Sequence, residues 1–178
     1  MTGTASAVEI LELDPDGYRA AIPGLTELTL DAIAGGASVN FLAGATAEDV
    51  AAWWTARTAS VEDGLTSPFV ARQGGRIVGS TLLMRSGNQN SPHRAEIGKV
   101  IVLRAARRQG IARALMEAAE ARARADGNWL LVLDTETGSG AEALYRSLGW
   151  NETGTVPNYA LLVDGRLSPA TFFWKDLR

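Results

Sequence analysis

The chain has 178 residues, of which 46% are hydrophobic, and this suits one globular domain (1–178) with a substantial core. Its net charge of -3 argues against a nucleic-acid-binding protein, which usually carries a basic footprint. With no cysteine and one histidine, it offers no disulfide, no thiolate or His-rich metal site and no cysteine nucleophile. No apolar run approaches transmembrane length. Residues 1–7, which we expect to be flexible, lack the basic start of a signal peptide, so we expect a cytoplasmic protein without a membrane partner.

Hydrophobic periodicity predicts an α/β protein in which a first strand and several helices precede a run of strands. Strands are expected over 8–13, 69–72, 76–85, 93–103, 129–134, 150–156 and 171–174. Helical segments are expected over 18–21, 25–33, 46–59, 111–126 and 141–148. Pro23-Gly24 is expected to interrupt the first helical region. Gly79 is expected to mark a bulge or a close approach.

The stretch from Val100 to Ala112 reads V-I-V-L-R-A-A-R-R-Q-G-I-A, a β-branched run followed by a basic turn and a helix start. The run is typical of a strand buried on both faces. The first N–H groups of a helix lack internal partners, and Gly110 would let backbone approach a phosphate closely. Three arginines add positive charge: Arg107, Arg108 and Arg113. The turn therefore indicates an anion site, but it lacks the lysine and hydroxyl residue of a P-loop.

This turn resembles the Q/R-x-x-G-x-G/A signature of the GNAT acyl-CoA N-acetyltransferase superfamily, with Arg107, Gly110 and Ala112 at the signature positions. The later segment A-L-Y-x-x-x-G-W, residues 143–150, resembles the A-x-x-L-Y-x-x-x-G-F/W segment of the same enzymes. Where many members have an asparagine seven residues before the tyrosine, this chain has Gly138, followed by Ser139. D-T-E-T-G-S at 134–139 further resembles the subset that includes the tabtoxin-resistance acetyltransferase.

The resemblance implies a mixed, mostly antiparallel sheet of about seven strands, flanked by about four helices and splayed between strands 4 and 5. It implies acetyl-CoA as the cofactor, with coenzyme A as the product. The residues that would bind the cofactor are Val100, Ile101, Val102, Arg107, Arg108, Gln109, Gly110, Ile111, Ala112, Arg113 and Ser139. From the residue composition, no metal site is expected. The family analogy suggests a homodimer.

Acetyl transfer to an amine needs a group that takes the amine proton and another that protonates the leaving thiolate. Tyr145 matches the tyrosine of the family segment and is the candidate for the thiolate partner. Glu96 and Asp134 lie on the two strands predicted to flank the splay and are the candidates for the base. Glu136 is a weaker third candidate, and His93 reads better as a solvated loop-end histidine.

The sequence thus predicts an N-acetyltransferase for a small-molecule amine, such as an amino-acid-like toxin, an antibiotic or a metabolite. Two alternatives stay open: a non-catalytic acyl-CoA-binding module, and a protein or peptide N-acetyltransferase. A dinucleotide-binding enzyme is a weaker rival, because Gly138-x-Gly140-x-x-Ala143 formally matches its glycine motif. The acceptor pocket is expected to be shaped by residues 23–45 and 86–92. Trp53 and Trp54 are expected to dock their helix rather than bind acceptor.

Overall fold

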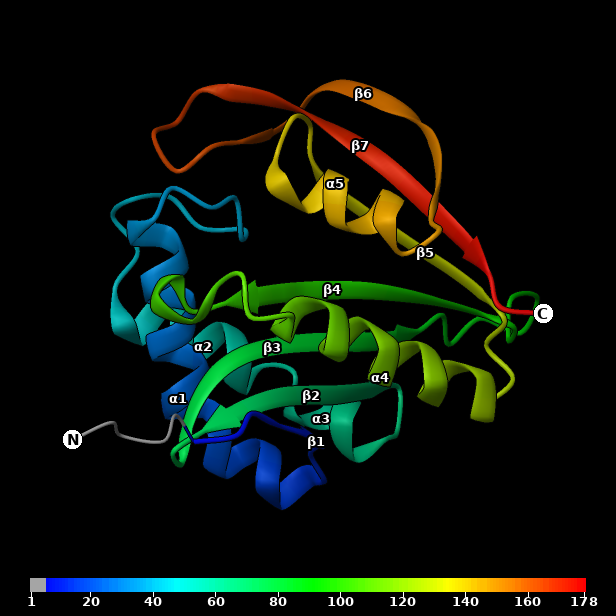
Figure 1. Ribbon diagram of the computed structural model, residues 1–178, viewed down its shortest axis with the longest axis horizontal. Coiled ribbons are helices and arrows are strands. Elements are labelled where there is room, and N and C mark those ends of the chain that lie inside the picture. The colour runs from blue at the N-terminus through cyan, green and yellow to red at the C-terminus, as the bar shows by residue number, and fades with distance from the viewer. Residues whose placement is uncertain (1–5) are drawn as a thin grey trace.

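The computed structural model describes residues 6–178 and contains one seven-stranded sheet with the order β1-β2-β3-β4-β5-β7-β6 (Figure 1). Its strands are β1 (Glu9–Glu12), β2 (Thr66–Gln73), β3 (Arg76–Arg85), β4 (Arg94–Val102), β5 (Leu130–Glu136), β6 (Asn151–Leu161) and β7 (Leu167–Asp176). All neighbouring strands are antiparallel except β4 and β5, which are parallel. The predicted mixed, mostly antiparallel sheet is confirmed.

Within residues 6–178, five α-helices flank the sheet, close to the number of about four that the resemblance implies. Two expected helical segments, 18–21 and 25–33, are one helix, and the helix expected over 46–59 is divided into two. The five helices are α1 (Pro15–Ala34), α2 (Ala47–Thr55), α3 (Thr58–Glu62), α4 (Ile111–Ala125) and α5 (Gly140–Ser147). A 3-10 turn, η1 (Arg104–Ala106), lies between β4 and α4. None of the helices within residues 6–178 is long and apolar enough to cross a membrane.

The predicted interruption of the first helix at Pro23 is wrong. Helix α1 continues through Pro23, although a proline removes one internal hydrogen bond. Pro23 lies on the exposed side of the helix, whereas Tyr18 and Leu25 on either side of it are buried against the rest of the molecule. Packing on both sides of the proline thus outweighs the lost hydrogen bond.

The helix predicted over 46–59 begins as expected, with Thr46 and Asp49 forming a capping box. It does not continue to residue 59. The Arg57 guanidinium bonds the Trp53 carbonyl at 2.7 Å, and the Arg57 backbone N–H bonds the Trp54 carbonyl instead, which tightens the last turn and ends α2. α3 therefore starts as a separate short helix.

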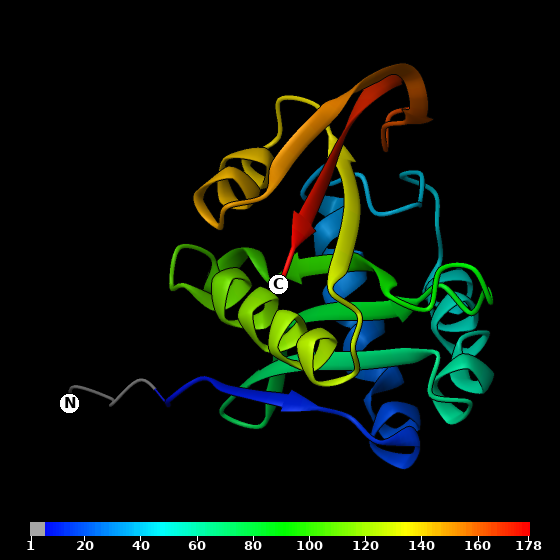
Figure 2. The same ribbon diagram turned by 90° about the vertical axis from the view of Figure 1, so that its right-hand side faces the viewer.

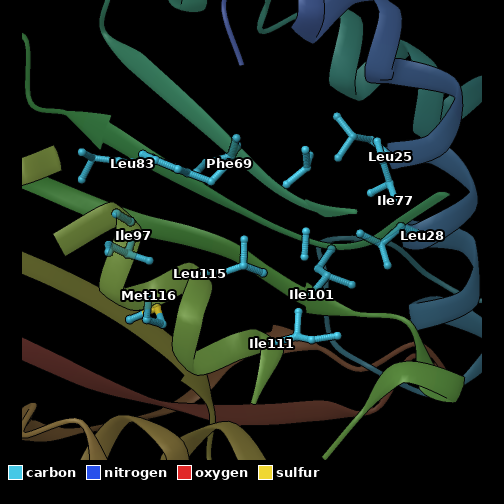
Figure 3. Close-up of a cluster of buried hydrophobic side chains, with 14 of the residues drawn as sticks. Leu25, Leu28, Phe69, Ile77, Leu83, Ile97, Ile101, Ile111, Leu115 and Met116 are labelled. Atoms are coloured by element: carbon cyan, nitrogen blue, oxygen red, sulfur yellow. The ribbon is translucent and has the colours of Figure 1, made fainter. Parts of the chain in front are cut away.

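Gly79 marks both a bulge and a close approach. Ala71 pairs with Gly79 while Arg72 pairs with Ile77, so Val78 is the extra residue in β3. A Cβ atom on Gly79 would lie 3.0 Å from side-chain atoms of Ile111 and Leu115 in α4. The bulge and the missing side chain let α4 lie directly on β3. Figure 3 shows Ile111 and Leu115 of α4 on one side of the strands and Leu25 and Leu28 of α1 on the other.

The feature that positions the site is the short pairing between β4 and β5. Only Arg94, Ala95 and Glu96 pair with β5, opposite Leu130 to Val132. Beyond Glu96 the two strands diverge, as Figure 1 shows toward its left side and Figure 2 shows by the steep crossing of β5 and β7 over the other strands. The splay expected between strands 4 and 5 is therefore present.

The dinucleotide-binding rival does not fit this topology. In such a fold the strand that follows the glycine motif and its helix lies parallel in the same sheet. Here β6, which follows α5, lies at the edge of the sheet and pairs antiparallel with β7.

Of the segment 1–7 that was predicted to be flexible, residues 1–5 lie outside the described part. In the rest of that segment, the Ser6 carbonyl accepts a hydrogen bond from the Gln73 side chain at 3.0 Å.

Candidate active site

A cavity of about 1270 Å³ lies between the diverging strands β4 and β5. Its walls come from the α1–α2 connection, the outer half of β4, the start of α4, the end of β5, α5 and the tip of the β6–β7 hairpin. Its lining divides into two ends. The end at α4 is made of backbone and arginines, and the end at the α1–α2 connection is made of aromatic and charged side chains.

The unpaired half of β4 forms one wall of the cavity. Val100, Ile101 and Val102 all line the cavity, and whereas Ile101 is buried, Val100 and Val102 are partly exposed. The prediction of a strand buried on both faces is therefore wrong for these residues, because β5 has moved away and left one side open. Backbone groups beyond Glu96 lack a β5 partner, so they remain available to the amides of a ligand that enters the splay.

The turn before α4 has the geometry of an anion site. Gly110 precedes the helix with a φ of 79°, in the left-handed region, and a Cβ there would meet nothing within 4 Å. The first internal bond of α4 joins the Ala114 N–H to the Gly110 carbonyl, so the N–H groups of Ile111, Ala112 and Arg113 precede the helical bonding pattern. These N–H groups lie at the positive end of the helix dipole, next to open space.

The arginines of the turn surround the same opening. Arg107, Arg108 and Arg113 line the cavity, and the Arg113 guanidinium bonds the Ser147 hydroxyl of α5 at 3.1 Å. Gln109 is exposed and is not among the lining residues. Ser139 lines the cavity at the start of α5, where its hydroxyl lies 3.3 Å from that of Thr135.

Tyr145 lies on α5 with its ring between Trp150 and Phe173, at centroid distances of 6.2 and 5.9 Å. The residue is buried, yet it lines the cavity, and its hydroxyl forms no hydrogen bond with residues 6–178. Burial, with a smaller contribution from the Asp134 charge, raises the pKa of Tyr145 well above its usual range. The phenol therefore stays protonated at physiological pH and is available as a hydrogen-bond donor to a group in the cavity.

Glu96 and Asp134 both face the cavity, where the pairing of β4 and β5 ends. Burial and the Asp134 charge raise the pKa of Glu96. Burial also raises the pKa of Asp134, partly offset by Lys99. A carboxylate with a raised pKa is a stronger base at neutral pH. The structure thus brings together the two carboxylates expected on sequence grounds.

The residues that were weaker candidates for the site lie in different places, some on the cavity and some away from it. Glu136 lines the cavity beside Asp134. His93 does not line it, because its ring stacks on Trp129 at a centroid distance of 4.5 Å. Of the two tryptophans, Trp54 is fully buried and donates to the Thr29 hydroxyl at 3.0 Å, as expected for a docking residue. Trp53 instead lines the cavity.

Several cavity residues were not expected from the sequence. Lys99 and Arg57 line the end opposite the arginines of the turn, together with Asn40, which falls within the expected segment 23–45. Lys99 is the only charged residue between Ile97 and Val102, which was an available signal, but Arg57 comes from another element and carries no local pattern. The segment 37–42 shapes the cavity as expected within 23–45, whereas 86–92 does not line it.

A splayed sheet, a helix start that can bind an anion and titratable side chains between them are features expected of an acyl-CoA-dependent transferase. Residues 32–150, more than half of the chain, match the sequence model of the acetyltransferase (GNAT) family. The chain belongs to this family, whose members are acetyltransferases that use acetyl-CoA. The superfamily expected from the two motifs is confirmed.

Solved structures of other proteins have the same fold. The chain is 26% identical to a ribosomal-protein-alanine N-acetyltransferase from Brucella melitensis, with a TM-score of 0.76, over 95% of this chain and 99% of that one. It is 23% identical to yncA, a putative acetyltransferase from Salmonella typhimurium solved with acetyl-CoA, with a TM-score of 0.76, over 97% and 95% of the two chains. A putative phosphinothricin N-acetyltransferase is 18% identical, with a TM-score of 0.77, over 97% and 99%.

The residues present fit acetyl-CoA. Its phosphates need anion-binding groups, and the free N–H groups at the start of α4 and three arginines supply them. Its pantetheine amides need backbone partners, and the outer half of β4 has no β5 partner. Within residues 6–178 no cluster of three or more His, Cys, Asp or Glu could hold a metal ion.

Proposed function

We propose that this protein transfers the acetyl group of acetyl-CoA to a primary amine of a small molecule. The observation that carries the proposal is the pair of carboxylates, Glu96 and Asp134, facing the same cavity as the free hydroxyl of Tyr145. Acetyl-CoA supplies an acetyl group activated as a thioester. Backbone of Val100 to Val102, the turn from Arg107 to Arg113, and Ser139 would hold it.

The two carboxylates would act on the acceptor. A primary amine is mostly protonated at neutral pH, and only its neutral form has a free electron pair. The acceptor reacts as the neutral amine: its nitrogen forms the new C–N bond as the C–S bond breaks, and Glu96 or Asp134 takes the extra proton that this nitrogen then carries, directly or through water. The raised pKa of both groups brings their basicity closer to that of the amine.

Tyr145 would act on the leaving group. The sulfur leaves with the electron pair of the C–S bond and needs a proton. The Tyr145 phenol, kept protonated by burial, gives that proton to the sulfur. Its two ring contacts fix the direction of the hydroxyl, so the side chain loses little freedom when it acts.

The acceptor class also rests on sequence resemblance. The segment Asp134–Ser139 resembles the tabtoxin-resistance subset, which favours a small amino-acid-like acceptor and a role in detoxification. A peptide acceptor is the second candidate, because the 26%-identical structure is of a ribosomal-protein-alanine N-acetyltransferase. The segment 37–42 and Tyr159 to Leu161 of β6 both line the acceptor end of the cavity, which favours a compact acceptor over an extended one.

The test has two steps. Thermal shift with acetyl-CoA, coenzyme A, NAD and ATP should raise the melting temperature with the two CoA species alone, since a ligand that binds only the folded state stabilises it. Thiol release from acetyl-CoA is then measured with small amines and with a peptide that begins with alanine. Release with small amines supports the proposal, release with the peptide alone favours the second candidate, and CoA binding without release indicates a non-catalytic module.

A further inference from the structure

Two cations meet on one indole ring at the acceptor end of the cavity. The Arg57 guanidinium carbon lies 3.0 Å from the centroid of the Trp53 ring, and the Lys99 ammonium lies 4.4 Å from it. All three side chains line the cavity. Phe41 packs edge-on against the same ring at 6.3 Å, so the cations are held beside an apolar surface.

Lys99 reaches this position through a bulge in β4. Leu82 of β3 pairs with Gly98 and Ser80 pairs with Ile101, so β4 has one residue more than β3 over this interval. Lys99 adopts a φ of 53°, in the left-handed region that a lysine rarely occupies. Its ammonium bonds the side-chain oxygen of Asn40, which itself has a φ of 72°. Two strained residues from distant segments thus hold one charge in the cavity.

Neither Lys99 nor Arg57 forms a direct ion pair with a carboxylate of residues 6–178. Their hydrogen-bond partners are neutral: Lys99 bonds the Asn40 amide oxygen and Arg57 bonds the Trp53 carbonyl. Burial and the Arg57 charge lower the pKa of Lys99 to about 8, against the opposing influence of Asp134 and Glu96. Two like charges on one ring are unfavourable unless an anion joins them.

Two negatively charged groups line the same cavity as the two cations, and one of them lies a short way along β4. Glu96 lies three residues before Lys99, and burial together with the Asp134 charge raises the pKa of Glu96. A carboxylate pair and a cation pair therefore face one space. A molecule with an amine at one end and an anion at the other complements both pairs, whereas a simple amine complements only the first.

We propose that Lys99 and Arg57, held against Trp53, form an anion subsite that selects acceptors carrying a carboxylate beside the reacting amine, as in a free amino acid with an apolar side chain. The proposal rests on the proposed function, in that Glu96 and Asp134 receive the amine. Phe41 and Trp53 supply the apolar surface for the side chain.

The test compares each amino acid with two analogues that lack the charge. Leucine is measured against leucinamide and isopentylamine, and phenylalanine against phenylalaninamide and 2-phenylethylamine, by kcat/KM from thiol release. The amide has a less basic amine than the amino acid and the decarboxylated amine a more basic one, so basicity cannot explain a preference over both. We expect the amino acids to lead by about tenfold to a hundredfold, the range for a hydrogen bond to a charged group.

Variants locate the preference. Lys99→Met should bring the ratio close to one while the KM for acetyl-CoA stays the same, and Lys99→Arg should keep most of the ratio. Arg178→Met is the matched control, because it also removes one positive charge but lies at the chain end away from the mouth of the splay (Figure 1). It should leave the ratio unchanged.

Binding keeps the two proposals distinguishable. Calorimetry of the same compounds with the CoA-bound protein measures the subsite without turnover. Turnover without a carboxylate preference overturns the subsite and keeps the acetyltransferase. Carboxylate-dependent binding without turnover keeps the subsite and overturns the catalytic assignment. If no carboxylate of the series binds or reacts, or if Lys99→Met keeps the full ratio, the subsite is overturned.

Discussion

The two ends of the cavity are built in different ways. The cofactor end comes from one continuous segment, Val100 to Arg113, in which a strand, a turn and a helix start follow one another. The acceptor end comes from four separate places: the α1–α2 connection, α2 with the residues just after it, the bulge of β4, and β6. One end therefore depends on local backbone geometry and the other on how distant elements pack.

This difference explains which end can vary. Backbone N–H groups at a helix start can bind a phosphate without a particular set of side chains. The acceptor end, by contrast, is defined by side chains such as Lys99 and Trp53, and each can be replaced without changing the course of the chain. A fold that uses one acetyl donor with many different acceptors is expected to have a site divided in this way.

The largest effect should come from the cofactor end. Gly110→Asp places a side chain and a negative charge where the phosphates would lie, at a φ of 79°. We expect the Kd for acetyl-CoA to rise about a thousandfold or more, because like-charge juxtaposition costs several kcal/mol. Calorimetric titration measures this change.

Gly127→Asp is the matched control for that variant. Gly127 follows the other end of α4 with a φ of 78°, and a Cβ there also meets nothing within 4 Å. Both variants should lose about 1–2 kcal/mol of unfolding free energy through backbone strain. Only Gly110→Asp should lose the ligand, and normal acetyl-CoA binding by that variant would disprove the phosphate assignment.

A second prediction concerns the frame that both ends share. Glu120 of α4 is buried and accepts hydrogen bonds from the Lys175 ammonium of β7 at 2.7 Å and from the Trp150 indole at 3.0 Å. Glu120→Gln leaves the Lys175 charge without its counter-ion. We expect a loss of about 3 kcal/mol in unfolding free energy, measured by urea denaturation.

The double variant Glu120→Gln with Lys175→Met should recover part of that loss, because no uncompensated charge remains. Acetyl-CoA binding, measured well below the melting temperature, should stay near that of the wild type in both variants. If Glu120→Gln kept the unfolding free energy of the wild type, the ion pair would not contribute to holding α4 and β7 together.

A third prediction addresses the point where the two ends meet. Tyr145→Phe should lower kcat about a hundredfold with little change in the KM for acetyl-CoA, since a general acid contributes at least that much. The Tyr145 hydroxyl forms no hydrogen bond with residues 6–178, so the melting temperature should stay the same. An unchanged kcat would show that the sulfur takes its proton from another donor.

The order and type of the elements could be predicted because each depends on short patterns. The start of α4 at Gly110 and the hairpin of β2 and β3 follow from neighbouring residues alone. The errors arose where packing overrides a local rule. Helix α1 continues through Pro23 because residues before and after the proline, such as Tyr18 and Leu25, are buried. Helix α2 ends because the Arg57 side chain bonds the Trp53 carbonyl.

The candidate site follows the same division. The expected residues of the cofactor end line the cavity, except Gln109, and all of them but Ser139 belong to the continuous segment Val100 to Arg113. Glu96 and Asp134 could be placed because the resemblance indicated which strands flank the splay. Lys99 and Arg57 could not be paired from the sequence, since they lie 42 positions apart and meet only through the bulge of β4 and the Trp53 ring.

The smallest effect should separate the two carboxylates. Burial raises the pKa of both carboxyl groups, and the Asp134 charge raises the pKa of Glu96 further. A base with a raised pKa is still protonated when ordinary carboxyl groups are ionised, so kcat/KM should fall as the pH is lowered through that raised value. In Asp134→Asn the neighbouring charge is gone, and Glu96 should ionise at a lower pH.

The acid limb of the kcat/KM profile should therefore move to lower pH in Asp134→Asn, with only a few-fold loss at neutral pH, a loss well below that expected for removing a general base. Glu96→Gln should instead lose turnover across the whole profile. If Asp134→Asn is the variant that loses turnover, Asp134 is the base, and Glu96 belongs with the groups that grip the acceptor ammonium. Either result places the proton-accepting atom on one side of the splay, on β4 or on β5.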